Sequence, residues 1–167
     1  MRDPADLERA VREAVDRLEV AYEWLLCDPD FADSAAFCER YGYPLENTGN
    51  TIIVASRRGP KQYAACVVQA SSQLDVNHTV RRLMGVRRLS FASAEETATL
   101  TGMALGGVTP FHLPDNLPLY VDAPVVALDY VILGAGSRSA KVKVSPAVFD
   151  EIPNARVVPG LSLAPKP

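Results

Sequence analysis

One stretch rich in proline and glycine, residues 102–118, restricts the possible folds of this chain more than any other. Its 17 positions hold three of the chain's 13 prolines and three of its 10 glycines. That composition excludes a regular helix and an ordinary ladder-forming strand. The stretch nevertheless carries six apolar side chains, more than a solvated linker would expose: Met103, Leu105, Val108, Phe111, Leu113 and Leu117. We therefore expect a shaped loop that is pinned to the body of the protein.

The glycines and prolines of this loop favour a segment that offers its main chain to a ligand. Gly106 and Gly107 allow the backbone to approach whatever lies opposite. Pro110 removes one hydrogen-bond donor and restricts the backbone angles of Thr109 before it. These features predict a binding loop.

Length and composition indicate one globular domain. The chain has 167 residues, of which 48% are apolar and 22% charged. The longest apolar runs are only strand-sized, which argues against a membrane span, and a charged N-terminus argues against secretion. Cys27, Cys38 and Cys66 match neither a disulfide framework nor a zinc site, so we expect reduced thiols, no metal, no cofactor and a cytoplasmic location.

Charge is segregated along the chain. Residues 1–46 hold five basic and twelve acidic side chains, whereas residues 57–88 hold seven basic side chains and a single acidic one. The basic residues are Arg57, Arg58, Lys61, Arg81, Arg82, Arg87 and Arg88. They either face a polyanion or occupy solvated helix and turn positions, and charge alone favours the second interpretation.

Hydrophobic periodicity and capping residues predict helices and strands that intermingle without strict alternation. Helices are expected over residues 4–17, 33–41, 75–85 and 93–100, the last opened by a Ser93–Glu96 capping box, with a short one from 145. Strands are expected over residues 20–26, 50–56, 62–69, 88–91, 119–122, 130–133 and 141–144. This order predicts a single α+β domain with a mixed, strongly curved sheet and helices packed outside it. Residues 1–18 would form an N-terminal helix, residues 19–152 the main domain and residues 153–167 an irregular tail.

Familiar catalytic motifs are absent from the sequence. There is no Gly-x-Ser-x-Gly elbow, Walker loop, HExxH or CxxC. His78 is expected to have an exposed structural role, while His112 is as readily a plain loop residue as a functional one. The glycine-rich run at 134–138 fails as a dinucleotide loop, because Ser139 replaces the third glycine and a strand pattern follows. It predicts a turn that presents Ser137 and Arg138.

Several motifs, in order and with conserved spacing between them, resemble the YbaK/ProX family of aminoacyl-tRNA editing domains, which is related to the insertion domain of bacterial prolyl-tRNA synthetase. They are Gly-Gly-Val-Thr-Pro-Phe at 106–111, Leu-Pro at 117–118, Tyr-Val-Asp at 120–122, Leu-Asp-Tyr-Val at 128–131, Gly-x-Gly-Ser-Arg at 134–138 and Ser-Pro at 145–146. The resemblance covers roughly residues 20–152. It implies a mixed α/β domain that hydrolyses the ester between a wrong amino acid and the terminal adenosine of a tRNA.

The resemblance also implies roles for individual residues. In the family a Gly-x-x-x-Pro loop, here Gly106–Pro110, holds the aminoacylated 3′ end of tRNA largely through backbone groups. We predict catalytic roles for Asn50, Gly106 and His112. Substrate binding is predicted for Tyr22, Thr51, Gly107, Thr109, Pro110, Phe111, Gly136, Ser137 and Arg138, the last three at the rim of the pocket. Contacts to the tRNA backbone are predicted for Arg81, Arg82, Arg87 and Arg88, and an aminoacyl-tRNA synthetase is a second candidate partner.

Three positions differ from the family pattern. Asn50 stands where members with editing activity carry a lysine, His112 where glycine commonly follows Phe, and Lys141 about where Cys-specific members carry an acidic residue. An amide can donate a hydrogen bond but brings no charge. The sequence therefore leaves three hypotheses: a deacylase of mischarged tRNA that acts in trans, a binding module for aminoacyl-tRNA, amino acid or synthetase that has lost hydrolysis, and a hydrolase of another small ester.

Overall fold

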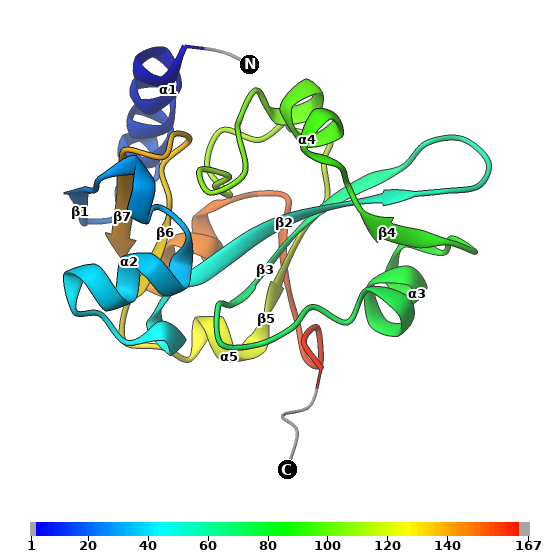
Figure 1. Ribbon diagram of the computed structural model, residues 1–167. Helices are drawn as coiled ribbons and strands as arrows, with labels where there is room; N and C mark the ends of the chain where they lie inside the picture. Colours follow the sequence, from blue (N-terminus) through cyan, green and yellow to red (C-terminus); the bar gives the residue numbers. More distant parts are fainter. Residues whose placement is uncertain (1–2, 164–167) are drawn as a thin grey trace.

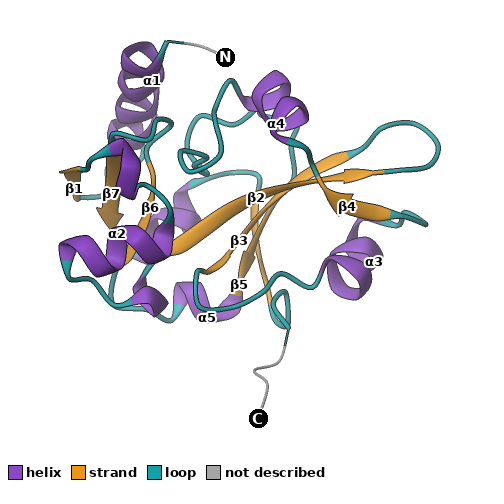
Figure 2. Ribbon diagram, viewed as in Figure 1, coloured by secondary structure: helices purple, strands orange, loops and turns teal. Residues whose placement is uncertain are grey.

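The computed structural model describes residues 3–163, which form a single α+β domain with two β-sheets (Figures 1 and 2). The larger sheet has the order β4-β2-β3-β5-β8. Its strands are β4 Leu89–Phe91, β2 Gly49–Ser56, β3 Tyr63–Gln69, β5 Leu119–Asp122 and β8 Ala155–Val158. The smaller sheet has the order β1-β7-β6, formed by β1 Tyr22–Leu26, β7 Ala140–Val144 and β6 Val131–Gly134. The predicted α+β class and mixed pairing are confirmed, because β3, β5 and β8 pair in parallel and the other ladders are antiparallel.

The predicted mixed, strongly curved sheet is divided into two sheets, which within residues 3–163 are joined only by a bridge between Thr48 and Ile132. Continued parallel pairing along β2 and β6 would next place Asn50 opposite Gly134. The carbonyl of Val108 instead lies against Gly134, so close that a Cβ atom would clash with it. The loop at residues 102–118 therefore packs against β6 just beyond the bridge between Thr48 and Ile132.

The helices begin and end where their capping residues predict. α1 Pro4–Arg17 starts at Asp3, whose carboxylate accepts from the N–H of Ala5 (2.9 Å). α4 Ala94–Thr101 starts with the predicted capping box, in which Ser93 and Glu96 bond each other's backbone N–H. The remaining helical segments are α2 Ser34–Tyr41, α3 Arg81–Met84 after a π-helical turn Val76–Val80, α5 Ala123–Val126, and 3₁₀ turns at Pro29–Phe31, Leu45–Asn47 and Pro146–Glu151.

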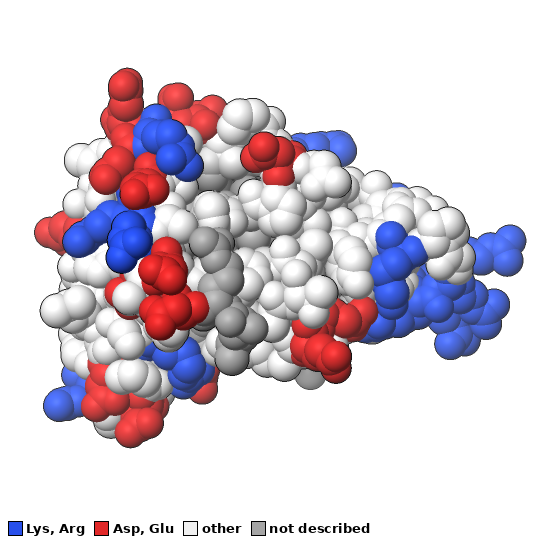
Figure 3. Space-filling model, turned by 90° about the horizontal axis from the view of Figure 1, so that it is seen from above, with Lys and Arg blue, Asp and Glu red and all other residues white. Residues whose placement is uncertain are grey.

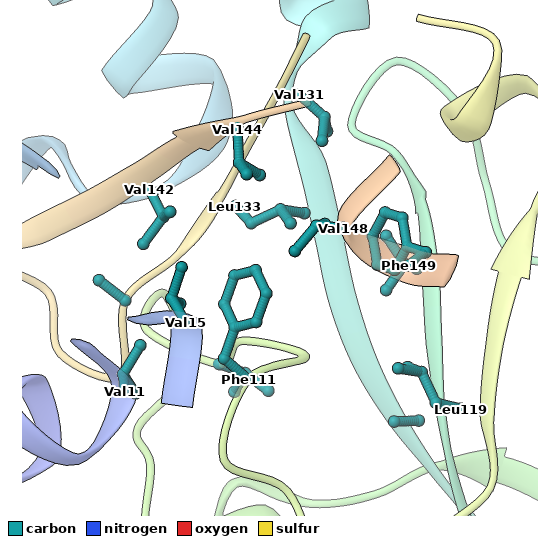
Figure 4. Close-up of a cluster of buried hydrophobic side chains, with 14 of the residues drawn as sticks. Val11, Val15, Phe111, Leu119, Val131, Leu133, Val142, Val144, Val148 and Phe149 are labelled. Atoms are coloured by element: carbon teal, nitrogen blue, oxygen red, sulfur yellow. The ribbon is translucent and has the colours of Figure 1, made fainter. Parts of the chain in front are cut away.

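The main core lies between the two sheets and is closed by α1 and the loop (Figure 4). Val11 and Val15 contribute the apolar stripe of α1, and both are fully buried. Phe111 reaches from the loop into the same space, toward Val15 and Leu133. The loop is therefore anchored by its apolar side chains, as its composition predicted.

The C-terminal segment is more regular than predicted. Residues 155–158 form β8, which pairs in parallel with β5, so the expectation of an irregular tail is wrong for this part. The buried carboxylate of Asp122 then accepts from the N–H of Leu161 (3.1 Å) and the hydroxyl of Ser162 (2.5 Å). A four-residue strand between two prolines carries too little periodicity to be recognised without its partner. Residues 164–167 of the predicted tail lie outside the described part.

Candidate functional site

A cavity of about 360 Å³ opens between α2, the beginning of β2, the loop at residues 102–118 and the smaller sheet. Three of the predicted site residues line it: Asn50, Thr51 and Gly106. The other lining residues are Ala32, Asp33, Ser34, Ala35, Leu45, Thr48, Gly49, Ile52, Ala70, Leu105, Val108, Ile132, Leu133, Gly134 and Lys141. The cavity is therefore lined by segments that lie between positions 32 and 141, and no single sequence motif includes all of them.

Arg138 fixes the loop at the mouth of the cavity. Its guanidinium donates to the carbonyl of Leu105 (3.1 Å), to the carbonyl of Pro29 (2.9 Å) and to the carboxylate of Asp33 (3.1 Å). Gly106 has a φ of +89°, and a Cβ atom at this position would collide with the same guanidinium. Glycine is therefore needed at position 106 both for its backbone angle and for space. Because Asp33 pairs with Arg138, its side chain does not cap α2, although the residue stands at the N-cap position.

The two glycine-rich stretches of the sequence meet beside the cavity. The N–H of Gly136 donates to the carbonyl of Gly107 (2.8 Å). A Cβ atom on Gly107 would lie 2.8 Å from backbone atoms of Ser137. The loop at 106–108 thus packs main chain against main chain on residues 134–137, which holds its backbone groups at fixed positions.

Lys141 is a buried cation in the cavity wall that the sequence did not single out as a site residue. It is 5% exposed, and its Nζ donates to the carbonyl of Gly106 (3.0 Å). Burial lowers the pKa of the ammonium below its ordinary value, and Arg138 nearby adds to this effect. Val142 and Val144 face the core, so Lys141 lies on the opposite face of β7. Phe37 of α2 covers this face of β7. The sequence did not predict that contact.

Asn50 and Thr51 present polar groups from β2. The hydroxyl of Ser34 donates to the side-chain oxygen of Asn50 (2.6 Å). Thr51 is 8% exposed, and its hydroxyl has no hydrogen-bond partner among the described residues. The main chain of Thr48 is hydrogen-bonded on the β3 side, whereas the carbonyl of Ile53 accepts a hydrogen bond on the opposite side of β2. Backbone groups alternate between the two sides along a strand, so the main chain of Thr51, like that of Ile53, points away from β3. β4 pairs only with residues 54–56, which leaves this edge of β2 open at Thr51.

Several predicted pocket residues lie outside this cavity. The hydroxyl of Tyr22 donates to Asp16 (2.7 Å), and the ring borders a separate hollow with Tyr130. Phe111 points into the core, and Thr109 and Pro110 are buried beside it. Ser137 donates to Glu8 (2.5 Å), and Gly136 binds the loop through the carbonyl of Gly107.

His112 is also outside the cavity. It has a φ of +65°, unusual for a residue other than glycine, and it borders two other hollows together with Arg17 and Asp115. Its predicted catalytic role would therefore require a substrate that reaches beyond the 360 Å³ cavity.

The basic residues of segment 57–88 gather at one end of the molecule, over the β2–β3 hairpin, α3 and β4, whereas at the other end Lys and Arg lie among Asp and Glu (Figure 3). Arg81 is committed to internal contacts, because it donates to the carbonyls of Asn77 and Arg87. Arg82, Arg87 and Arg88 are exposed, and within residues 3–163 they form no ion pairs. Arg58 is likewise exposed and outside the ion pairs of this part of the chain, so these four side chains are available to a polyanion.

Cys27, Cys38 and Cys66 are free and buried, and burial raises the pKa of the Cys66 thiol to about 12. The described part of the chain holds no cluster of three or more His, Cys, Asp or Glu side chains suited to a metal ion. None of its helices is long and apolar enough to cross a membrane.

Known proteins resemble this chain in sequence and in fold. Residues 28–152 match the family described as aminoacyl-tRNA editing domain. A solved protein proposed to be a trans-editing enzyme for prolyl-tRNA synthetase is 21% identical and superposes with a TM-score of 0.80, over 98% of this chain and all of its own. The hypothetical protein APE2540 is 27% identical with a TM-score of 0.81, over 92% of this chain and 99% of its own. The matched residues include every segment that lines the cavity.

Proposed function

This chain belongs to the family of aminoacyl-tRNA editing domains, and we propose that it is a deacylase that hydrolyses the ester of a mischarged tRNA in trans. The observation that carries the proposal is the cavity beside the Gly106–Pro110 loop. There the main chain is held by Arg138 and by the 134–137 segment, so its backbone groups are ordered before any substrate arrives. We place the aminoacylated 3′ end of the tRNA in this cavity.

The reaction needs positioning more than a strong nucleophile. A water molecule adds to the ester carbonyl carbon, the bond from that carbon to the ribose oxygen breaks, and the ribose oxygen receives a proton. Fixed donors that face the developing oxyanion lower the barrier of such a step. The hydroxyl of Thr51, the amide of Asn50 and the main chain of the loop are the groups we assign to orient the acyl group.

The exposed arginines extend the proposed substrate contacts beyond the cavity. Arg82, Arg87 and Arg88 would bind phosphates of the tRNA without reading its sequence. One of the solved neighbours is proposed to serve prolyl-tRNA synthetase, so a synthetase is the protein partner to test first. Such a protein would act in the cytoplasm, where tRNA is charged.

A panel of mischarged tRNAs incubated with purified protein tests the proposal. We expect faster release of the amino acid from at least one of them, and slower release with Gly106→Ala, because a Cβ atom would displace Arg138. Excess uncharged tRNA should compete, whereas a hydrolase of other small esters would be unaffected. If no charged tRNA is deacylated faster than in buffer, the enzymatic proposal fails.

One observation favours a binding module without hydrolysis as the second candidate. Asn50 brings no charge to the position where active relatives carry a lysine, and its side-chain oxygen is already engaged by Ser34. Asn50→Lys separates the candidates. Activity that appears only in the variant supports the binding module, and activity in the unchanged protein rejects it.

A further inference from the structure

The charges around the cavity do not balance. Lys141 and Asp33 are the charged side chains that line it, and Asp33 is already paired with Arg138 at 3.1 Å. Only the neutral carbonyl of Gly106 accepts from the Lys141 ammonium among the described residues. Lys141, Arg138 and Asp33 together therefore carry one positive charge that no acidic side chain of the cavity balances.

A buried ammonium with a single neutral acceptor is an expensive arrangement. Removal of a charge from water is unfavourable unless a counter-charge or several hydrogen bonds replace the lost hydration. An ammonium has three donors, and among the described residues only the carbonyl of Gly106, at 3.0 Å, accepts a hydrogen bond from Lys141, while the ring of Phe37 lies 5.9 Å away. The remaining donors are available to a ligand in the cavity.

A second, independent group lines the same cavity. The hydroxyl of Thr51 is buried and has no hydrogen-bond partner within residues 3–163, which also carries an energetic cost. Lys141 is on β7 and Thr51 on β2, so an ammonium with one hydrogen-bond acceptor and a hydroxyl with none among the described residues line the cavity from different sheets. An oxygen-rich ligand would satisfy both at once.

We infer that Lys141 and Thr51 form a subsite for an anionic oxygen group of the bound substrate. This inference rests on the proposed function and narrows its substrate: the group is a carboxylate of the aminoacyl side chain or the phosphate next to the terminal adenosine. The two share the same chemistry, a negative charge spread over oxygens that accept hydrogen bonds from an ammonium and a hydroxyl.

Non-hydrolysable probes distinguish the two sources. The base probe is adenosine with alanine joined to the 3′ position by an amide. A second probe carries glutamate in place of alanine, and a third carries alanine and a 5′-phosphate. We expect one of the anionic probes to bind the unchanged protein at least about tenfold more tightly than the base probe in calorimetry, as one charge-assisted hydrogen bond implies.

Lys141→Met should abolish that gain while leaving the affinity for the base probe within about twofold. Thr51→Val should reduce the same gain severalfold.

The matched control is Lys143→Met, since Lys143 lies two residues further on the same face of β7, where it pairs with Glu23 outside the cavity (3.4 Å). Lys143→Met should keep the full gain. Replacement of a buried charge by an apolar side chain is usually tolerated, and thermal unfolding would verify that Lys141→Met folds.

Each remaining outcome overturns the inference. If Lys141 serves only to hold Gly106, its loss weakens all three probes equally. If neither anionic probe gains over the base probe, or no probe binds, the cavity has no anion subsite. Because binding is measured without turnover, a failure to hydrolyse mischarged tRNA would reject the proposed enzyme and leave this result standing.

Discussion

At the scale of single residues, the loop depends on glycines whose neighbours leave no space for a side chain. Gly106, Gly107 and Gly134 each face another backbone or a fixed guanidinium. The sequence predicted a backbone-presenting loop from Gly106 and Gly107, and that part was predictable because glycine has local consequences. Which segment would lie opposite was not predictable, since it is more than 25 residues away along the chain.

Gly107→Ala tests this close packing. A Cβ atom would lie 2.8 Å from the backbone of Ser137, so the loop must move, and we expect a loss of about 1–3 kcal/mol in the free energy of unfolding. Urea unfolding measures the change. Gly59→Ala is the control, because Gly59 has a φ of +72° but open space around it, and should cost only about 1 kcal/mol. Equal losses in the two variants would contradict the packing argument.

Lys141 gives a prediction about pH. Its pKa is lowered in the folded protein by burial, and Arg138 adds to the decrease, while Cys27, Asp33 and Cys38 act in the opposite direction. Between this lowered pKa and the ordinary lysine value, the unfolded chain holds a proton that the folded chain has released. The free energy of unfolding should therefore rise with pH in this window relative to Lys141→Met. Urea titrations of both proteins from neutral pH to about pH 10 check the sign.

At the scale of elements, local signals were sufficient where an element carries its own caps and periodicity. α1, α4 and the β2–β3 hairpin all appear where the sequence predicted them. β8 was missed because its four residues become a strand only through pairing with β5. The second sheet was missed because the division of the strands between two sheets depends on pairing between segments that are distant in the chain.

The capping box of α4 supports the loop that follows it. α4 ends at Thr101, and its C-cap residue Gly102 is the first residue of the loop. Ser93→Ala removes the acceptor of the Glu96 N–H and should lower the free energy of unfolding by about 1 kcal/mol. Ser71→Ala, at an exposed turn serine, is the control and should change it by less than about 0.5 kcal/mol. Chemical denaturation would contradict the role of the cap if both substitutions had the same effect.

At the scale of the whole molecule, charge segregation along the sequence becomes segregation in space. The net charge is −3, yet one end of the protein carries a concentration of arginines (Figure 3). If these arginines bind tRNA, affinity must fall steeply as salt is raised, because each phosphate contact releases counterions.

Replacement of Arg82, Arg87 and Arg88 by glutamine tests this contribution. Each lost phosphate contact should reduce the slope of log affinity against log salt by about 0.7–0.9, hence by about 2 to 3 for the triple variant. Filter binding of uncharged tRNA at several salt concentrations measures the slope. Arg9→Gln, on α1 and paired with Asp6, should leave the slope unchanged. If the slope is unaltered in the triple variant, these arginines do not contact tRNA.

Local physical chemistry determines several features of this fold that the sequence alone predicts. They are the helix starts at Asp3 and Ser93, the strands of the hairpin, and the irregular loop with its need for glycine. Each of these depends on residues that are neighbours in the chain. The cavity is different, because Lys141, Thr51 and Gly106 come together only when α2, two sheets and the loop pack. Burial and partner choice arise from contacts between distant segments, so the cation in the cavity wall could be recognised only in the folded molecule.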